Sequence, residues 1–115
     1  MKDVESLITE LQQFVAERDW AQFHDPKNLA MLLASEVGEL VAEYRWVASD
    51  AADGHALDGE ARARIADEIG DVGIALLLLC DRTGIDLGQA IAAKIAKNRG
   101  RYPVEKARGR AGRVE

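Results

Sequence analysis

Helical periodicity is the feature that most limits how this chain can fold. Apolar side chains recur at intervals of three and four residues along most of the sequence, whereas the alternating pattern of a half-buried strand is nearly absent. This periodicity predicts four helices, over residues 4–18, 26–49, 60–83 and 87–99. Asp25 and Pro26 form a typical helix start, and Gly84 offers a left-handed helix end. Four helices with short connections predict an all-α chain that folds as an up-and-down four-helix bundle or as half of a larger bundle.

The length of 115 residues is that of one domain. The polar N-terminus is not followed by an apolar run, which argues against a secretory signal, and the apolar stretch 72–80 is much shorter than the ~20 residues that cross a bilayer. Cys80 is the single cysteine, so no internal disulfide can form. We therefore expect a cytoplasmic protein with no membrane association. Residues 1–106 are expected to form the domain, and residues 107–115 a basic, partly ordered tail.

Charge is distributed unevenly along the chain. The net charge is −5, but residues 94–115 carry about +6, which leaves about −11 on the rest. A basic end on an acidic body suits a nucleic-acid-binding arm or a disordered tail. It equally suits a set of phosphate ligands for a site whose metal ligands lie in the acidic part. Charge alone leaves these three interpretations open.

The second predicted helix carries acidic residues on its apolar side. At about 100° per residue, Glu36, Glu39 and Glu43 fall within an arc of roughly 60°, and Leu32 lies in the same arc. Ionised carboxylates on a buried face are tolerated only when they are paired, hydrogen-bonded or bound to metal. The helix therefore predicts a polar site inside the fold, unless these acids are ordinary solvated surface charges.

The third predicted helix repeats this arrangement. Glu68 and Asp71 precede the stretch 72–80, which is apolar on all sides and therefore typical of a central helix. Together with Glu36 and Glu39 they would form an all-oxygen site between two helices. Such ligands select a hard cation, Mg²⁺ above all, with Mn²⁺ or Ca²⁺ as alternatives. Neither histidine lies within a turn of these acids, which argues against a zinc or iron site.

The two acidic pairs and several other segments resemble a known family. Glu36-Val37-Gly38-Glu39 and, after a gap of 28 residues, Glu68-Ile69-Gly70-Asp71 form an EXXE…EXXD pattern. This pattern is similar to that of the MazG-like all-α nucleoside triphosphate pyrophosphatases. Further segments resemble the dCTP pyrophosphatase branch of that superfamily: residues 17–24, 26–29, 35–40 and 98–103, and Trp46. The resemblance covers about residues 4–106.

The resemblance implies a MazG-like bundle that is completed by oligomerisation, as a homodimer or homotetramer. It implies a Mg²⁺-dependent pyrophosphohydrolase that removes dCTP or modified dCTP from the nucleotide pool, giving dCMP and pyrophosphate. The implied catalytic and metal-binding residues are Glu36, Glu39, Glu68 and Asp71. The implied phosphate-binding residues are Lys94, Asn98, Arg99 and Arg101. The implied base-binding residues are Trp20, His24, Trp46 and Tyr102.

Alternatives stay open for both the residues and the function. Trp46 suits a core position as well as a base pocket, Trp20 suits a loop anchor, and a Lys-Asn pair suits a solvated helix face. His55, in a linker predicted over residues 50–59, is assigned no role. A broader pyrophosphatase acting on dUTP or several nucleoside triphosphates is the alternative within the same chemistry. An alternative of another class is a non-catalytic helical module that binds a partner or nucleic acid, although the acidic body would repel phosphates in the absence of metal.

Overall fold

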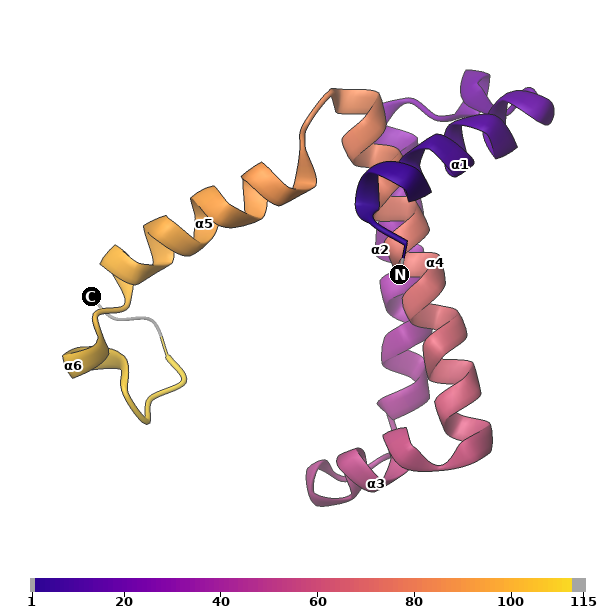
Figure 1. Ribbon diagram of the computed structural model, residues 1–115. Coiled ribbons are helices and arrows are strands. Elements are labelled where there is room, and N and C mark those ends of the chain that lie inside the picture. Colours follow the sequence, from indigo (N-terminus) through magenta and orange to yellow (C-terminus); the bar gives the residue numbers. More distant parts are fainter. Residues whose placement is uncertain (1, 113–115) are drawn as a thin grey trace. The chain divides into compact units, whose positions relative to one another are not determined.

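Four aspartates start the four long helices of the protein. The computed structural model describes residues 2–112 (Figure 1). Each aspartate accepts a hydrogen bond of 2.8–3.2 Å from the backbone N–H three residues later, which satisfies one of the donors left free at a helix start. The caps are Asp3, Asp25, Asp58 and Asp86. They precede α1 (Val4–Glu17), α2 (Pro26–Tyr44), α4 (Gly59–Thr83) and α5 (Leu87–Arg101).

Short helical turns make most of the remaining structure. They are η1 (Ala21–Phe23), η2 (Ser49–Ala51), α3 (Ala52–Leu57) and α6 (Val104–Ala107). The described residues contain no strand, so the predicted all-α class is confirmed. Among these residues, no helix is long and apolar enough to cross a membrane.

The segment between the second and third predicted helices differs from expectation. The predicted linker over residues 50–59 is mostly helical, and α2 ends at Tyr44 instead of near residue 49. The ring Nε2–H of His55 lies 3.0 Å from the backbone oxygen of Glu43, one of the last carbonyls of α2, and donates to it. A helix end leaves such carbonyls without partners, and here the short α3 supplies one. The alanines of this segment favour the helix despite Gly54.

The chain divides into two units, Met1–Gly84 and Ile85–Glu115. In the first unit, α2 and α4 run side by side in opposite directions, and they form its main packing contact (Figure 1). α1 packs on α4 near one end of the pair, and α3 packs on α4 at the other end, where α2 stops. The first unit is therefore a long helical pair with a shorter element at each end.

Buried apolar side chains lie toward the two ends of α4. Ala61 and Ile65 are buried near its start, and Ala75, Leu77 and Cys80 are buried farther along it. No residue of α4 between Ile65 and Ala75 is fully buried. The middle of α4, which carries the predicted acidic ligands, therefore lies between two apolar clusters and keeps access to solvent.

The second unit consists of α5 and α6. The backbone N–H of Tyr102 donates to the oxygen of Asn98 at 2.8 Å and closes the last turn of α5. The expected tail over residues 107–115 begins at the end of α6, and its residues 113–115 lie outside the described part of the chain. The division into a 1–106 domain and a 107–115 tail stays a prediction.

Candidate active site

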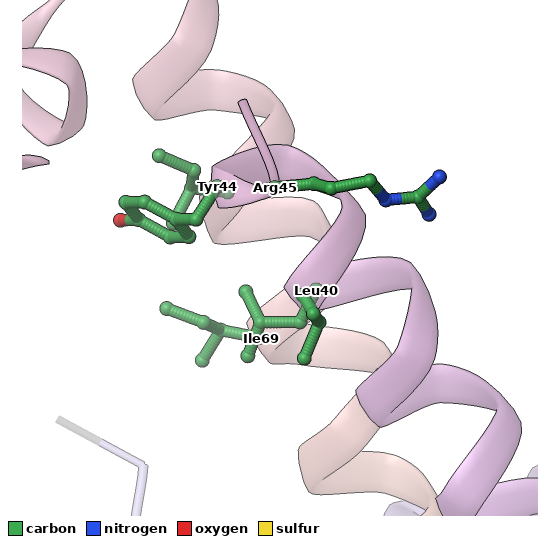
Figure 2. Close-up of a pocket in the computed structure, with 6 residues that line it drawn as sticks. Leu40, Tyr44, Arg45 and Ile69 are labelled. Carbon is green, nitrogen blue, oxygen red and sulfur yellow. The ribbon is translucent and has the colours of Figure 1, made fainter. Parts of the chain in front are cut away.

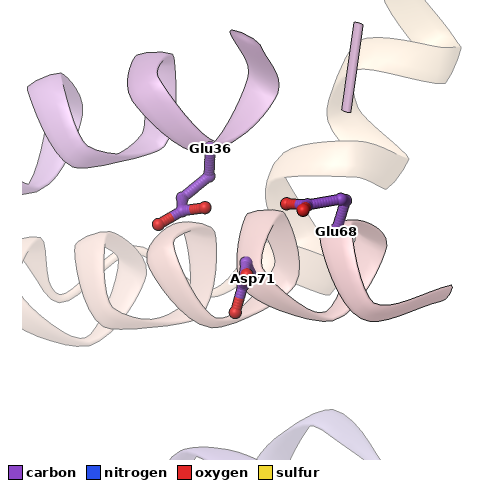
Figure 3. A group of neighbouring side chains, drawn as sticks. All are labelled: Glu36, Glu68 and Asp71. Atoms are coloured by element: carbon purple, nitrogen blue, oxygen red, sulfur yellow. The ribbon is translucent and has the colours of Figure 1, made fainter. Parts of the chain in front are cut away.

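Three of the four predicted acidic ligands come together between α2 and α4. Each of Glu36, Glu68 and Asp71 offers a carboxylate oxygen, and these three atoms lie within 4.8 Å of one another (Figure 3). Glu36 extends from α2, and the other two project from α4. The three-residue spacing on α4 places Glu68 and Asp71 along one side of that helix, as the sequence predicted. All three side chains are half-buried.

The fourth predicted ligand, Glu39, lies beside this cluster but outside the group of three. It is exposed, and it is close enough to act electrostatically on Glu68. Burial has the largest effect and raises the pKa of Glu68 above its ordinary value of 4.5. Neighbouring negative charges raise it further; in decreasing order of effect they are Asp71, Glu39, Asp67 and Glu36.

The donor set of the cluster suits a divalent cation. Its three contributing groups are carboxylates, the ligands that hard cations such as Mg²⁺ prefer. Among the described residues, none of the three forms an ion pair with a basic side chain. Three like charges within 4.8 Å repel one another, and a cation between them would remove that repulsion.

The third acid of the predicted stripe on α2, Glu43, has different partners. Arg64 of α4 donates from Nε to both of its carboxylate oxygens, at 3.0 and 3.3 Å. The Nε2 atom of His55 lies 3.9 Å from the same carboxylate, and the His55 ring meets Tyr44 edge-on at 5.5 Å. Glu43 is thus a structural junction of α2, α3 and α4, and it is no part of the carboxylate cluster.

An apolar cavity of about 630 Å³ adjoins the cluster in the first unit. Leu32 lines it from α2, one turn before Glu36, and Gly70 lines it from α4, next to Asp71. Most of its lining is aliphatic or aromatic, and Glu10 and His24 are its ionisable members. The full lining is Leu7, Glu10, Leu11, Phe14, Val15, Trp20, His24, Leu32, Gly70, Gly73, Ile74, Leu77 and Leu78.

The loop that follows α1 brings Trp20 and His24 to this cavity. Asp19 adopts a left-handed conformation with φ of 54°, and the N–H of Trp20 then donates to the oxygen of Val15 at 3.1 Å. The Trp20 ring packs edge-on against Phe14, with centroids 5.7 Å apart. From the far end of α4, Arg82 donates to the backbone oxygen of Ala21 at 3.2 Å and ties the loop down.

Comparison with protein families decides what kind of chain this is. The model of the MazG-like family matches residues 31–114, which include both acidic pairs and the whole of α5. The chain belongs to the MazG-like family.

Similar proteins of known name are pyrophosphatases. The chain is 44% identical over 112 residues to dCTP pyrophosphatase 1 of Rattus norvegicus, covering 96% of this chain and 64% of the relative. It is 39% identical over 108 residues to dCTP pyrophosphatase 1 of Homo sapiens, covering 94% and 62%. This MazG-like chain therefore spans somewhat less than two thirds of the length of these relatives.

A solved structure agrees with the fold assignment. A pyrophosphatase from Archaeoglobus fulgidus superposes with a TM-score of 0.82 at 35% identity, covering 90% of this chain and 94% of that one. The predicted MazG-like all-α fold is confirmed, whereas its completion by oligomerisation stays a prediction.

The other predicted site residues of this MazG-like chain lie elsewhere. Trp46 follows the end of α2 with 89% of its surface exposed, and it does not line the cavity. The interpretation of Trp46 as a core residue is therefore wrong for this chain. The remaining predicted residues belong to the second unit, and their roles stay predictions. They are Lys94, Asn98, Arg99, Arg101 and Tyr102.

Sequence reasoning missed three participants in this region. The pattern of the sequence assigns no role to His55 and singles out neither Arg64 nor Glu10. For Arg64 a signal existed, because it lies four residues before Glu68 and therefore on the acidic side of α4. For His55 and Glu10 no local sequence pattern indicates a role. His55 meets the end of α2, and Glu10 reaches the cavity, only because the fold brings distant segments together.

Proposed function

We propose that this MazG-like chain is a Mg²⁺-dependent nucleotide pyrophosphohydrolase that converts dCTP, or modified dCTP, to dCMP and pyrophosphate. The observation that carries the proposal is the meeting of Glu36, Glu68 and Asp71 beside an apolar cavity. The names of the similar dCTP pyrophosphatases support the substrate.

The carboxylates are proposed to hold the cation, with Glu39 at the edge of the site. Mg²⁺, or Mn²⁺ in its place, would neutralise charge on the triphosphate oxygens and lower the pKa of an attacking water. Glu36, Glu68 and Asp71 would fix its position from two helices. The oxygen of this water forms a bond to the α-phosphorus, and the bond from that phosphorus to the pyrophosphate oxygen breaks. The products are dCMP and pyrophosphate.

The cavity is proposed to receive the base. Trp20 and Phe14 offer aromatic surface for stacking, and the half-buried His24 offers a ring nitrogen. The carboxylate of Glu10 is an acceptor for the exocyclic amino group of cytosine, a group that uracil and thymine lack. The proposed preference for cytosine follows from this acceptor.

The basic residues of the second unit are proposed to bind the phosphates. Lys94 and Asn98 lie one turn apart on α5, so both can reach one phosphate chain. Arg99 and Arg101 lie in the last turn of the same helix and add positive charge. Trp46 and Tyr102 stay proposed members of the base pocket.

A homodimer or a homotetramer is proposed as the working form. Val37, Val41 and Ile69 of the first unit are 41–58% exposed. A shallow apolar groove of about 390 Å³ lies beside them, with Leu40, Tyr44 and Ile69 in its lining (Figure 2). An apolar surface of this kind supports burial against a second copy. Light scattering after size exclusion tests it, and a monomer at micromolar concentration would contradict it.

The activity is tested by pyrophosphate release from a panel of deoxynucleoside and nucleoside triphosphates. We expect Mg²⁺-dependent turnover of dCTP that stops with chelator and is lost in Glu36→Gln. Turnover of dUTP or of many nucleotides would retain the chemistry and reject the specificity. The absence of turnover with every nucleotide would reject the enzyme, and a partner-binding module would then be the better interpretation.

A further inference from the structure

The ion pair between Glu43 and Arg64 lies near the carboxylate cluster, one helical turn from Glu68 on α4 and two turns from Glu36 on α2. Glu43 follows Glu39 by four residues on α2, and Arg64 precedes Glu68 by four residues on α4, so the pair spans the same two helices as the cluster. The side chain of Glu43 is only 17% exposed, that of Arg64 is 55% exposed, and the single Nε–H of Arg64 is shared between the two carboxylate oxygens. A pair with one half-buried partner is better placed to tie two helices together than a fully exposed pair.

The pair lies where the two helices repel each other. Glu36 on α2 faces Glu68 and Asp71 on α4 with oxygens within 4.8 Å, which pushes the helices apart when no cation is bound. The middle of α4 has no fully buried residue to oppose this force. The nearest attractive polar contact between α2 and α4 in the described chain is Glu43 with Arg64.

The far side of Glu43 is fixed as well. His55 of α3 donates from Nε2 to the backbone oxygen of Glu43 at 3.0 Å, and its ring packs against Tyr44. The end of α2 therefore cannot shift along α4 without losing contacts to two different elements. This fixes the position from which Glu43 meets Arg64.

We propose that Arg64 is a positioning residue: through Glu43 it holds α2 and α4 at the separation and register that the carboxylate site needs before the cation arrives. The proposal rests on the proposed metal site. It assigns Arg64 no contact with the cation or the nucleotide. It also explains why a third acid on the stripe of α2 does not join the cluster.

The test is the affinity of the full-length chain for Mn²⁺, measured by titration calorimetry at one pH for wild type, Arg64→Ala, Glu43→Gln and the double variant. Arg64 repels a cation at the site, because both are positively charged. By charge alone, its loss should therefore tighten cation binding. The positioning role of Arg64 through Glu43, called the clamp below, predicts the opposite change in affinity. Under the clamp, Arg64→Ala should bind Mn²⁺ about three- to tenfold more weakly than wild type. It also predicts that the double variant is weakened by less than the sum of the two single variants, because both changes break one contact.

Arg62→Ala is the matched control. Arg62 lies on the same helix and carries the same charge, but it donates to the oxygen of Ala56 in α3, at 3.2 Å, and among the described residues it forms no ion pair with Glu43. Its variant should bind Mn²⁺ at least as tightly as wild type. Equal weakening in Arg62→Ala and Arg64→Ala would overturn the clamp in favour of a general charge effect.

The remaining outcomes separate the clamp from the metal site. Mn²⁺ affinity in Arg64→Ala equal to or above that of wild type, with only a lower melting temperature, would overturn the clamp and leave the metal site standing. No Mn²⁺ binding by the wild-type chain would overturn the metal site and the clamp together. Arg64→Met retains the aliphatic stem of the side chain and so should fold even if Arg64→Ala is unstable; it too should bind Mn²⁺ more weakly than wild type, and equal or tighter binding would overturn the clamp.

Discussion

Leu32 and Glu36 lie one turn apart on α2, and the first lines the apolar cavity while the second belongs to the carboxylate cluster. On α4, Gly70 lines the same cavity and the next residue, Asp71, belongs to the cluster. The cavity and the cluster are therefore carried by the same two helices, without an intervening element. A nucleoside triphosphate has an apolar, planar base at one end and anionic phosphates at the other. Adjacent sites of these two kinds match one such molecule.

Removing one carboxylate should separate catalysis from folding. In Asp71→Asn we expect pyrophosphate release to fall on the order of 100-fold, because one cation ligand loses its charge. The melting temperature without metal should stay level or rise, since a repulsive charge is gone. Mg²⁺ should raise the melting temperature of wild type and have little effect on that of the variant. A pyrophosphate assay measures the rate, and calorimetry measures the melting temperatures with and without Mg²⁺. An equal Mg²⁺ shift in the two proteins would contradict the site.

The stability of the metal-free protein should depend on Glu68. Its pKa is raised in the folded chain, by burial first and by Asp71 next, so the folded state binds more protons than the unfolded state in the window above 4.5. The free energy of unfolding should therefore be highest below that window and should decrease as pH rises through it. Urea unfolding in chelator at a series of pH values measures this slope. In Glu68→Gln the slope should be smaller, and an unchanged slope would assign the effect to other groups.

Trp20 should matter for the base, whereas its neighbour Phe23 should not. Trp20 lines the cavity, and Phe23 of the same loop is 59% exposed and does not. Stacking on an aromatic ring contributes about 1–3 kcal/mol per base, so KM for dCTP should rise roughly tenfold or more in Trp20→Ala. Mn²⁺ affinity should not change, because the cluster is not touched. Phe23→Ala is the matched control. A similar KM increase in both variants would indicate a disturbed loop and no base contact.

Glu10 should set the preference between cytosine and uracil. In Glu10→Gln the acceptor for the cytosine amino group becomes neutral, and a hydrogen bond to a charged group contributes about 1.5–3 kcal/mol. The ratio of kcat/KM for dCTP over dUTP should fall roughly tenfold, mainly through dCTP. Glu10 also forms a 2.6 Å ion pair with Lys2, so Lys2→Ala is the control for loss of that pair. A preference that falls equally in Lys2→Ala would show that the pair, and not base reading, is responsible.

The periodic parts of the sequence predicted the fold well. Helices α1, α4 and α5 begin and end within two residues of their predicted bounds; an aspartate fixes where each begins, and Gly84 fixes the end of α4. The cluster of Glu36, Glu68 and Asp71 was also predictable, since three-residue spacing on an apolar helix face fixes where carboxylates point. Both predictions needed only local geometry.

The parts that sequence reasoning missed depend on contacts between distant segments. The helical turn at Ala52–Leu57 looks like a linker by composition, and its role becomes visible only when His55 meets the end of α2. Glu43 continues the acidic stripe, but its partner comes from 21 residues away, so spacing alone could not separate it from the metal ligands. Trp46 has the composition of a core or pocket residue, yet α2 ends just before it and leaves it exposed.

The phosphate-binding role of α5 can be tested on residues of that helix alone. In Lys94→Ala and Asn98→Ala we expect KM for dCTP to rise roughly tenfold each, because each removes a donor to an anionic phosphate. Their Mn²⁺ affinity without nucleotide should match wild type, since the cluster lies wholly in the first unit. Lys106→Ala is the matched control, because it removes an equal charge from an exposed position of the same unit that lies on α6 and not on α5. If Lys106→Ala raises KM as much as Lys94→Ala, the second unit attracts nucleotides only by its overall charge. The basic end of the chain would then contribute to encounter with the substrate and not to the site itself.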